Sequence, residues 1–343
     1  MTKDNSYSIA IIIPNWNGKK YLPSMLDSIL AQSFEDFRVF VIDDQSTDGS
    51  TDVISSYASK DPRIHFMVRD REPKGAQTCR NIGFEQSEGA KYVVFFDNDD
   101  LIAPFCLRQR YDFMEAHPEL DFGIFPAINF KDHPYDEIGL AWGCRYIDDT
   151  LKSMLDWTLP MVGWTNIYRR SSYVDYNLSW DEKLKSMQDS DFNIQAILKG
   201  CKFDYADHAR PDYFYRDTQS SISSKLYSAE QADSHVHLVK KIFDSLSSSQ
   251  LHRYEDDLRS YFVKFLEILI SHKKQLSKLL DIDWLHSHPC FNLSLKLWSL
   301  FSFKGKLFYG LFSKEIKYFN SNQSSWRNFA RSKAEFFYNQ KVK

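Results

Sequence analysis

The stretch that decides the fold is SIAIIIPNWNGKKYLPSMLDSILAQSFEDFRVFVID, residues 8–43. It begins and ends with apolar runs of strand length, and apolar side chains recur at helical spacing between them, over 19–33. The same alternation continues along the chain. It predicts strands at 8–13, 38–43, 64–69 and 91–96, and helices at 19–33, 50–60 and 76–89. This pattern predicts an α/β fold whose mostly parallel, Rossmann-like central sheet has helices on both faces.

Polar clusters follow three of the predicted strands. They lie at 15–17, at 43–48 and at 97–100. In open α/β sheets, ligands bind beyond the carboxyl ends of the strands. The sequence therefore predicts one binding site built from these three loops.

The third loop, in FFDNDDL (95–101), carries three carboxylates within four positions: Asp97, Asp99 and Asp100. Like charges this close repel each other. One interpretation is a solvated loop after a buried strand. The other is a site where Mn²⁺ or Mg²⁺ cancels the repulsion and holds a diphosphate. A DxD pattern alone is common by chance, so it does not decide between these interpretations.

Taken together, the order and spacing of the three loops resemble the family 2 glycosyltransferases. These are inverting nucleotide-sugar transferases with the GT-A fold. The matching stretches are 9–54, 75–100 and 180–200. The resemblance extends over about 8–225 and does not cover the C-terminal part of the chain.

The resemblance implies roles for residues on the donor side. Pro14 and Trp16 would border the base, and Asp44 would accept a hydrogen bond from the nucleoside. Arg80 would lie near the donor phosphates. Arg216 fits a family arginine near the donor.

The resemblance also implies which acidic residues bind the metal and which one acts as the catalytic base. Asp97 and Asp99 would hold the metal and the ribose-diphosphate, with Asp100 beside them as a third metal ligand. Asp189 matches the catalytic base, whereas Gln188 stands where the family usually has a glutamate. Asp191 is a competing base, and it also suits a helix N-cap.

Domain organisation follows from composition as well as from the resemblance. We expect a GT-A catalytic domain over 1–225, with a nucleotide-sugar-binding part (1–130) and an acceptor-side part (131–225). A helical region follows over 226–343. Its tail, from 291 onward, carries a net charge of +8 and fourteen aromatic residues, whereas the remainder carries −11. The aromatic residues of this tail either pack against the body or bind an anionic membrane face. The acidic body argues against nucleic acid as a partner.

The expected function is transfer of one sugar from a nucleotide-sugar donor, a UDP-sugar in our interpretation. The acceptor would be a hydroxyl of a glycan or a lipid-linked oligosaccharide, in surface polysaccharide biosynthesis. The five cysteines show no CxxC spacing, which is typical of reduced thiols in a cytoplasmic protein, so we expect that location. No apolar run reaches the roughly 20 residues of a membrane helix, so the protein would be peripheral on the membrane if the tail binds lipid. Two alternatives remain: a sugar nucleotidyltransferase, and an inactive family member that serves as a scaffold.

Overall fold

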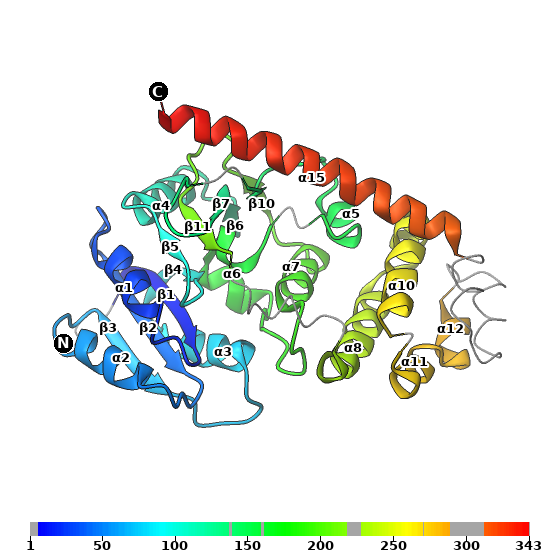
Figure 1. Cartoon of the computed structure of the whole chain (residues 1–343), viewed down its shortest axis with the longest axis horizontal. Coiled ribbons are helices and arrows are strands. Elements are labelled where there is room, and N and C mark those ends of the chain that lie inside the picture. Colours follow the sequence, from blue (N-terminus) through cyan, green and yellow to red (C-terminus); the bar gives the residue numbers. More distant parts are fainter. Residues whose placement is uncertain are drawn as a thin grey trace.

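The structure, a computed structural model, describes residues 6–136, 139–158, 161–217, 228–269, 271–288 and 312–342. Figure 1 shows an α/β part joined to a group of helices, with one long helix lying along both. The predicted domain boundary near 225 lies outside the described residues, as do residues 291–311 of the predicted tail.

The central sheet has seven strands in the order β10-β6-β9-β4-β1-β2-β3. The neighbours β4, β1, β2 and β3 are parallel, whereas β9 runs antiparallel to both β4 and β6. The strands are β1 (Tyr7–Asn15), β2 (Phe37–Asp43), β3 (Ile64–Val68), β4 (Ala90–Phe95), β6 (Phe122–Ile124), β9 (Asn166–Arg169) and β10 (Phe203–Tyr205). The sequence therefore predicted the parallel half of the sheet, and the prediction is confirmed.

Helices cover both faces of this sheet because its strands carry apolar side chains on both faces. Ile9, Ile11 and Ile13 of β1 pack toward one face, and Ala10 and Ile12 pack toward the other. On the first side lie α1 (Leu22–Leu30), α2 (Ser50–Ala58) and α4 (Cys106–Ala116); on the second lie α3 (Ala76–Gln86), α5 (Thr150–Leu155), α6 (Arg170–Asp175) and α7 (Gln188–Leu198).

A second sheet, which the sequence did not predict, has four strands in the order β5-β11-β7-β8. These are β5 (Leu101–Ile102), β11 (Tyr213–Arg216), β7 (Ala127–Phe130) and β8 (Ala141–Trp142). Because β5 begins directly after the acidic loop, this sheet continues outward from the strand ends where the site was predicted.

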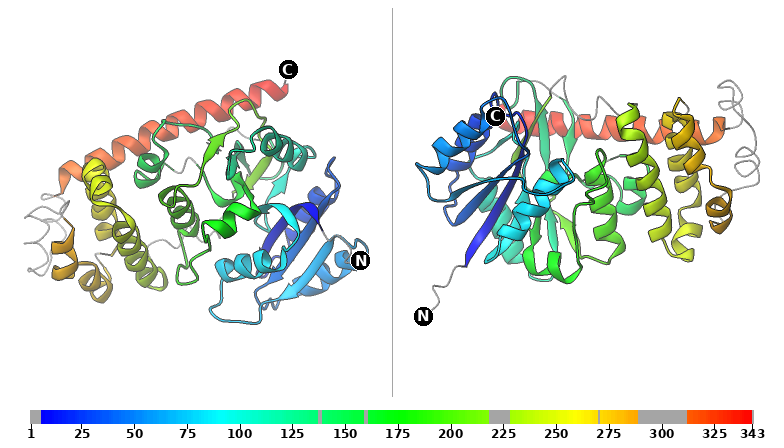
Figure 2. Two further views of the ribbon diagram at one scale, coloured as in Figure 1. Left: turned by 180° about the vertical axis from the view of Figure 1, so that it is seen from behind. Right: turned by 90° about the horizontal axis from the view of Figure 1, so that it is seen from below.

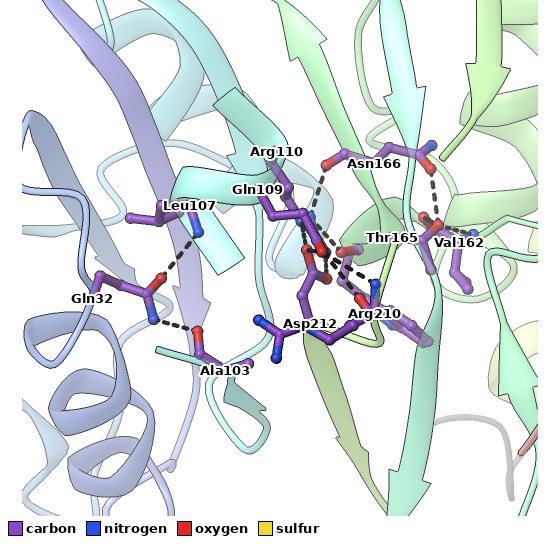
Figure 3. A network of polar contacts seen from close by, with 11 residues as sticks. Gln32, Ala103, Leu107, Gln109, Arg110, Val162, Thr165, Asn166, Arg210 and Asp212 are labelled. Carbon is purple, nitrogen blue, oxygen red and sulfur yellow. Dashed lines mark hydrogen bonds and ion pairs between the residues drawn. The ribbon is translucent and has the colours of Figure 1, made fainter. Parts of the chain in front are cut away.

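A buried ion pair anchors the second sheet to the first (Figure 3). Arg110 of α4 and Asp212, which precedes β11, are both fully buried and joined by two hydrogen bonds of 2.7 and 3.0 Å. Arg110 also donates to the carbonyl of Trp164 over 3.0 Å. Trp164 lies in a short 3₁₀ turn, η1 (Gly163–Thr165). The pair thus fixes η1 and β11 relative to each other.

The described part of the C-terminal region is helical, as predicted. The helices are α8 (Ala229–Ser245), α9 (Ser248–Arg253), α10 (Glu255–Leu269), α11 (Lys273–Leu279), α12 (Ile282–Ser287) and α15 (Ser313–Val342). None of the helices in the described ranges is both long enough and apolar enough to cross a membrane.

Helix α15 lies along the molecule, from α10 at one end to the second sheet at the other (Figures 1 and 2). Its buried side chains recur at intervals of seven, four, four and three residues, which places them on one face. They are Phe319, Trp326, Ala330, Ala334 and Phe337. Over 313–342 the aromatic residues of the tail therefore mostly pack against the body.

Candidate active site

The loop after β1 lies at the rim of the site. Pro14 is buried and paired within the sheet, so the strand continues through it to Asn15 instead of ending there. The ring of Trp16 is 56% exposed, and the ammonium of Lys74 lies 4.5 Å from its centre. Asn15 donates to Asp43 over 2.7 Å and accepts from Asn98 over 2.6 Å. Asn15 thus ties the three strand-end loops together.

Asp44 is buried at the end of β2, where it forms an ion pair with Arg69. Arg69 also contacts Glu72 over 3.2 Å. The sequence pattern gave no indication of Arg69. The guanidinium of Arg69 fixes one carboxylate oxygen of Asp44 and thereby orients the other. The contact of Asp44 with a nucleoside remains a prediction.

The three carboxylates of the acidic loop have different environments. Asp97 accepts a hydrogen bond from Nη2 of Arg80 over 2.7 Å, and its side chain is 30% exposed. Asp99 is half-buried, and burial, then the charge of Asp97, raises its pKa to about 6. Asp100 is fully buried: one oxygen accepts from the hydroxyl of Tyr213 (2.6 Å) and the other from the backbone N–H of Arg216 (2.7 Å).

The contacts of Asp100 give it a structural role that the sequence did not indicate, because both of its oxygens hold β11. Its role as a metal ligand remains a prediction. Within the described ranges, no group of three or more His, Cys, Asp or Glu side chains is placed to hold a metal ion. Asp97 and Asp99 nevertheless have the chemistry that Mg²⁺ or Mn²⁺ requires. Such ions often take only one or two carboxylates, and the remaining ligands are substrate phosphates and water.

Arg80 links the acidic loop to helix α7. Its side chain is buried, and its guanidinium lies 4.5 Å from the centre of the Trp180 ring. One terminal nitrogen donates to Asp97 and the other donates to Oε1 of Gln188 over 2.9 Å. Gln188 in turn donates to Gln77 over 2.8 Å. Gln188 therefore holds the arginine in place without adding a charge.

Asp189 lies beside this network, in the first turn of α7. Its Oδ1 accepts a hydrogen bond from the backbone N–H of Gly163 over 2.8 Å. Burial, which outweighs the opposing charge of Arg80, raises the pKa of the Asp189 carboxyl, and the charge of Asp97 adds to the increase. A carboxylate with a raised pKa is a stronger base, as proton abstraction from a hydroxyl requires.

Asp191 does not cap the helix, contrary to one of its predicted roles. Helix α7 begins three residues earlier, at Gln188, and Met187 occupies the cap position with φ 55°. The carboxylate of Asp191 is fully buried and pairs with Lys241 of α8 over 2.7 Å. Lys241 also contacts Asp181 over 2.8 Å. This arrangement favours a structural role for Asp191, that of joining α7 to α8.

Arg216, the last residue of β11, reaches back to the acidic loop. Its Nε donates to the backbone carbonyl of Asp99 over 2.7 Å, and its guanidinium lies between the rings of Tyr21 and Phe130, at 4.7 and 4.4 Å. Arg216 thus lies at the acidic loop, where the resemblance predicted a donor-side arginine.

The arrangement is that of an α/β domain of the GT-A type, with acidic and basic side chains gathered beyond the strand ends. Residues 10–176 match the model of the family described as Glycosyl transferase family 2. This stretch holds the three polar loops and Arg80. The chain therefore carries a glycosyltransferase family 2 domain.

Relatives and solved structures agree with this assignment. The chain is 24% identical to the uncharacterized glycosyltransferase EpsJ of Bacillus subtilis over 64% of each chain. It is 29% identical to the poly(ribitol-phosphate) beta-N-acetylglucosaminyltransferase TarS of Staphylococcus aureus, over 55% of this chain and 32% of that protein. The crystal structure of S. aureus TarS 1-349 in complex with UDP-GlcNAc has the same fold, with a TM-score of 0.62 and 19% identity over 94% and 92% of the two chains.

Proposed function

We propose that this protein transfers one sugar from a UDP-sugar to a hydroxyl of a glycan or lipid-linked oligosaccharide, with inversion at the anomeric carbon. The observation that carries the proposal is the position of Arg80, which contacts Asp97 of the acidic loop and Gln188 of the helix that carries Asp189. The buried side chain of Arg80 thus connects Asp97, on the donor side, to Gln188, the neighbour of the proposed base Asp189. The resemblance to polymer-modifying enzymes such as TarS supports a role in assembling cell-wall or other surface polysaccharides.

On the donor side, the side chains of the strand-end loops would hold the nucleotide. Trp16 offers an exposed ring at the rim, and Asp44, oriented by Arg69, would accept from the nucleoside. Asp97 and Asp99 would hold Mn²⁺ or Mg²⁺, which when bound supplies positive charge to the leaving diphosphate. Arg80 and Arg216 both contact the acidic loop and would act on the same phosphates.

On the acceptor side, Asp189 would remove the proton from the attacking hydroxyl. The N–H of Gly163 fixes one carboxylate oxygen, which leaves the other to face the acceptor. Inverting transfer is a single in-line displacement, so the base must lie on the side of the anomeric carbon opposite the diphosphate. A carboxylate on α7, separated from the acidic loop by Arg80, suits that requirement.

Gln188 stands where the family usually has a glutamate, and this difference is the reason to consider an inactive family member that serves as a scaffold. Gln188 still accepts the hydrogen bond from Arg80, so the contact does not depend on a carboxylate. This favours an active enzyme over a scaffold. A nucleotidyltransferase would release pyrophosphate, whereas a glycosyltransferase releases nucleoside diphosphate.

The product released therefore tests the proposal. The purified chain is incubated in Mn²⁺ with UDP-glucose, UDP-galactose and UDP-N-acetylglucosamine, and the UDP released is measured. A separate reaction holds UTP and a sugar 1-phosphate, the substrates of a nucleotidyltransferase, and there pyrophosphate is measured. We expect UDP from at least one donor, and NMR of a transferred product should show the inverted anomer. Release of pyrophosphate, or of neither product, would overturn the proposal.

The metal is tested on binding alone. Calorimetry should detect UDP binding in Mn²⁺ and little in EDTA, because the cation joins the carboxylates to the diphosphate. Asp99→Asn should weaken binding in Mn²⁺ by at least about tenfold, since it removes one hard anionic ligand. Asp112→Asn, an exposed aspartate of α4, serves as the control and should bind UDP like the wild type. Equal UDP affinity of the wild type in EDTA and in Mn²⁺ would show that no metal takes part.

A further inference from the structure

Four aromatic rings form a continuous cluster at the second sheet, which we name the aromatic platform: Trp142, Trp164, Tyr213 and Tyr215. Trp164 stacks on both tyrosines, with ring centres 4.8 Å from Tyr213 and 5.5 Å from Tyr215. Trp142 meets Trp164 and Tyr215 edge to face, at 5.9 and 5.5 Å. Four large rings in mutual contact make a rigid surface.

The platform is tied to both halves of the proposed active site. Trp164 directly follows Gly163, whose N–H holds Asp189. The hydroxyl of Tyr213 accepts from the backbone N–H of Asp97 over 3.1 Å and donates to Asp100 over 2.6 Å. The platform therefore connects the segment that holds the proposed base to the acidic loop that would hold the donor.

The two ends of the platform differ in exposure. Tyr213 is fully buried and Trp164 is 6% exposed, whereas Trp142 and Tyr215 are only half-buried. Residues 213 and 215 of one strand point to the same face of the sheet. The side chain of Tyr215 therefore lies on the face that also carries Tyr213, which contacts the acidic loop. The buried rings thus support two rings that still present surface to solvent beside the site.

A half-exposed indole beside a phenol suits the flat face of a sugar. One face of a pyranose ring presents C–H groups, which pack on aromatic rings, while the hydroxyls around its edge take hydrogen bonds. Burial, followed by the charges of Asp100, Asp97 and Asp99, raises the pKa of Tyr215. Its hydroxyl therefore stays protonated at neutral pH and can donate to a sugar oxygen. An acyclic polyol phosphate has no flat face to stack.

We propose that Trp142 and Tyr215 form the acceptor subsite and that the acceptor presents a pyranose ring there. The inference rests on the proposed function, since it concerns the acceptor of the same transfer. It adds that the acceptor is a sugar polymer or oligosaccharide with a pyranose at its reacting end, in contrast to a ribitol-phosphate chain.

Saturation-transfer NMR tests the subsite without knowledge of the natural acceptor. The probes are the methyl pyranosides of glucose, galactose, mannose and N-acetylglucosamine, each added with UDP and Mg²⁺, and ribitol 5-phosphate is the acyclic comparison. We expect at least one pyranoside to bind through C–H groups of one ring face. Trp142→Ala should weaken that binding by about tenfold, the factor that one aromatic contact contributes.

The controls separate stacking from folding. Trp284→Ala removes a half-buried tryptophan of α12, far along the chain from the platform, and should bind the pyranoside like the wild type. Trp142→Phe keeps an aromatic face and should retain most of the binding, which covers the case that Trp142→Ala does not fold.

Three outcomes would overturn the subsite: no pyranoside binds a wild type that binds UDP normally, pyranoside binding survives in folded Trp142→Ala, or ribitol 5-phosphate binds with the same dependence on Trp142. Calorimetry of UDP binding on the same samples distinguishes failure of the acceptor subsite from failure of the proposed function. A wild type that does not bind UDP would contradict the proposed function itself.

Discussion

Nη1 of Arg80 donates a hydrogen bond of 2.9 Å to Oε1 of Gln188, although the two residues are 108 positions apart in the sequence. The resemblance predicts a glutamate at 188, which would place a second carboxylate on the arginine. Because the amide is neutral, the carboxylates that act on Arg80 are Asp97, by direct contact, and Asp189, through space. The substitution keeps the geometry and changes the electrostatics around the proposed base.

Replacing Gln188 by glutamate should therefore change the pH dependence of transfer. A new negative charge next to Asp189 disfavours its ionised form, so the pKa of Asp189 rises. The base must be deprotonated to act, so the pH of half-maximal kcat on the acidic side should increase, by about one unit. The measurement is the pH–rate profile of Gln188→Glu against the wild type.

The matched control is Gln195→Glu, which adds the same charge at the other end of α7, where Gln195 contacts Ser245. Its pH of half-maximal kcat on the acidic side should stay near that of the wild type. If Gln188→Glu stays active and its pH of half-maximal kcat on the acidic side does not change, Asp189 is not the group whose ionisation limits the rate.

A second prediction concerns the close approach of Gly163 to the base. A Cβ at this position would lie 2.5 Å from Oδ1 of Asp189 and 2.7 Å from Cη2 of Trp180. Trp180 is almost fully buried and cannot yield, so Asp189 must move. Because a small misplacement of a reacting group can cost about 10²-fold, Gly163→Ala should reduce kcat by about that factor and leave UDP affinity near the wild-type value.

Loss of stability alone could also lower activity, and Gly200→Ala controls for it. Gly200 has φ +85°, so alanine there is strained by about 1 kcal/mol, but no heavy atom lies within 4 Å of the new methyl group. It should lower the melting temperature and keep the wild-type kcat. If Gly163→Ala has normal kcat, the close contact does not position the base.

The sequence predicted the elements that have a strong local signal. The apolar runs of β1, β2 and β4 are buried on both faces, and each was predicted to within a few residues. Strands β5 and β8 have two residues each, too few for any periodicity, so the second sheet was not predicted. Its existence depends on pairings between distant segments, which a local pattern does not contain.

The site was predictable to a similar degree. Aspartates and arginines in motif positions could be named, but their partners could not, because those come from other segments. Gly163 lies 26 residues before Asp189, and Gln77 lies 111 before Gln188. Asp100 was predicted as a metal ligand beside Asp97 and Asp99, and the sequence did not indicate that its carboxylate turns toward Tyr213. Sequence adjacency does not fix the direction of a side chain in an irregular loop.

A third prediction concerns the C-terminal helix. Phe336 and Phe337 are neighbours on α15, but Phe336 is 54% exposed and Phe337 is 7% exposed, packed against the second sheet. Phe337→Ala should lower the free energy of unfolding by about 3 kcal/mol, as for other buried phenylalanines, and Phe336→Ala by no more than about 0.5 kcal/mol. Urea unfolding measures both. Equal and small losses would show that α15 does not pack on the body in solution.

The last prediction separates Asp189 from Asp191, the two carboxylates that the sequence alone left in competition. Asparagine has the shape of aspartate, so in Asp189→Asn the oxygen held by Gly163 can remain in place while the base is lost. General-base catalysis contributes about 10²–10⁴-fold. Turnover should fall by that factor, with UDP binding and melting temperature near the wild-type values, because Asp97, Asp99 and Arg80 are unchanged.

Asp191→Asn should have the opposite profile. Its carboxylate is buried against Lys241, and weakening a buried pair leaves a charge without its full compensation. Asp181 still contacts Lys241 over 2.8 Å, which limits the loss to about 1–3 kcal/mol. We therefore expect a lower melting temperature and turnover within a few-fold of the wild type. If Asp191→Asn abolishes transfer while Asp189→Asn retains it, the base is Asp191. If both keep full transfer, neither carboxylate takes the acceptor's proton, and displacement assisted by a base on α7 is excluded.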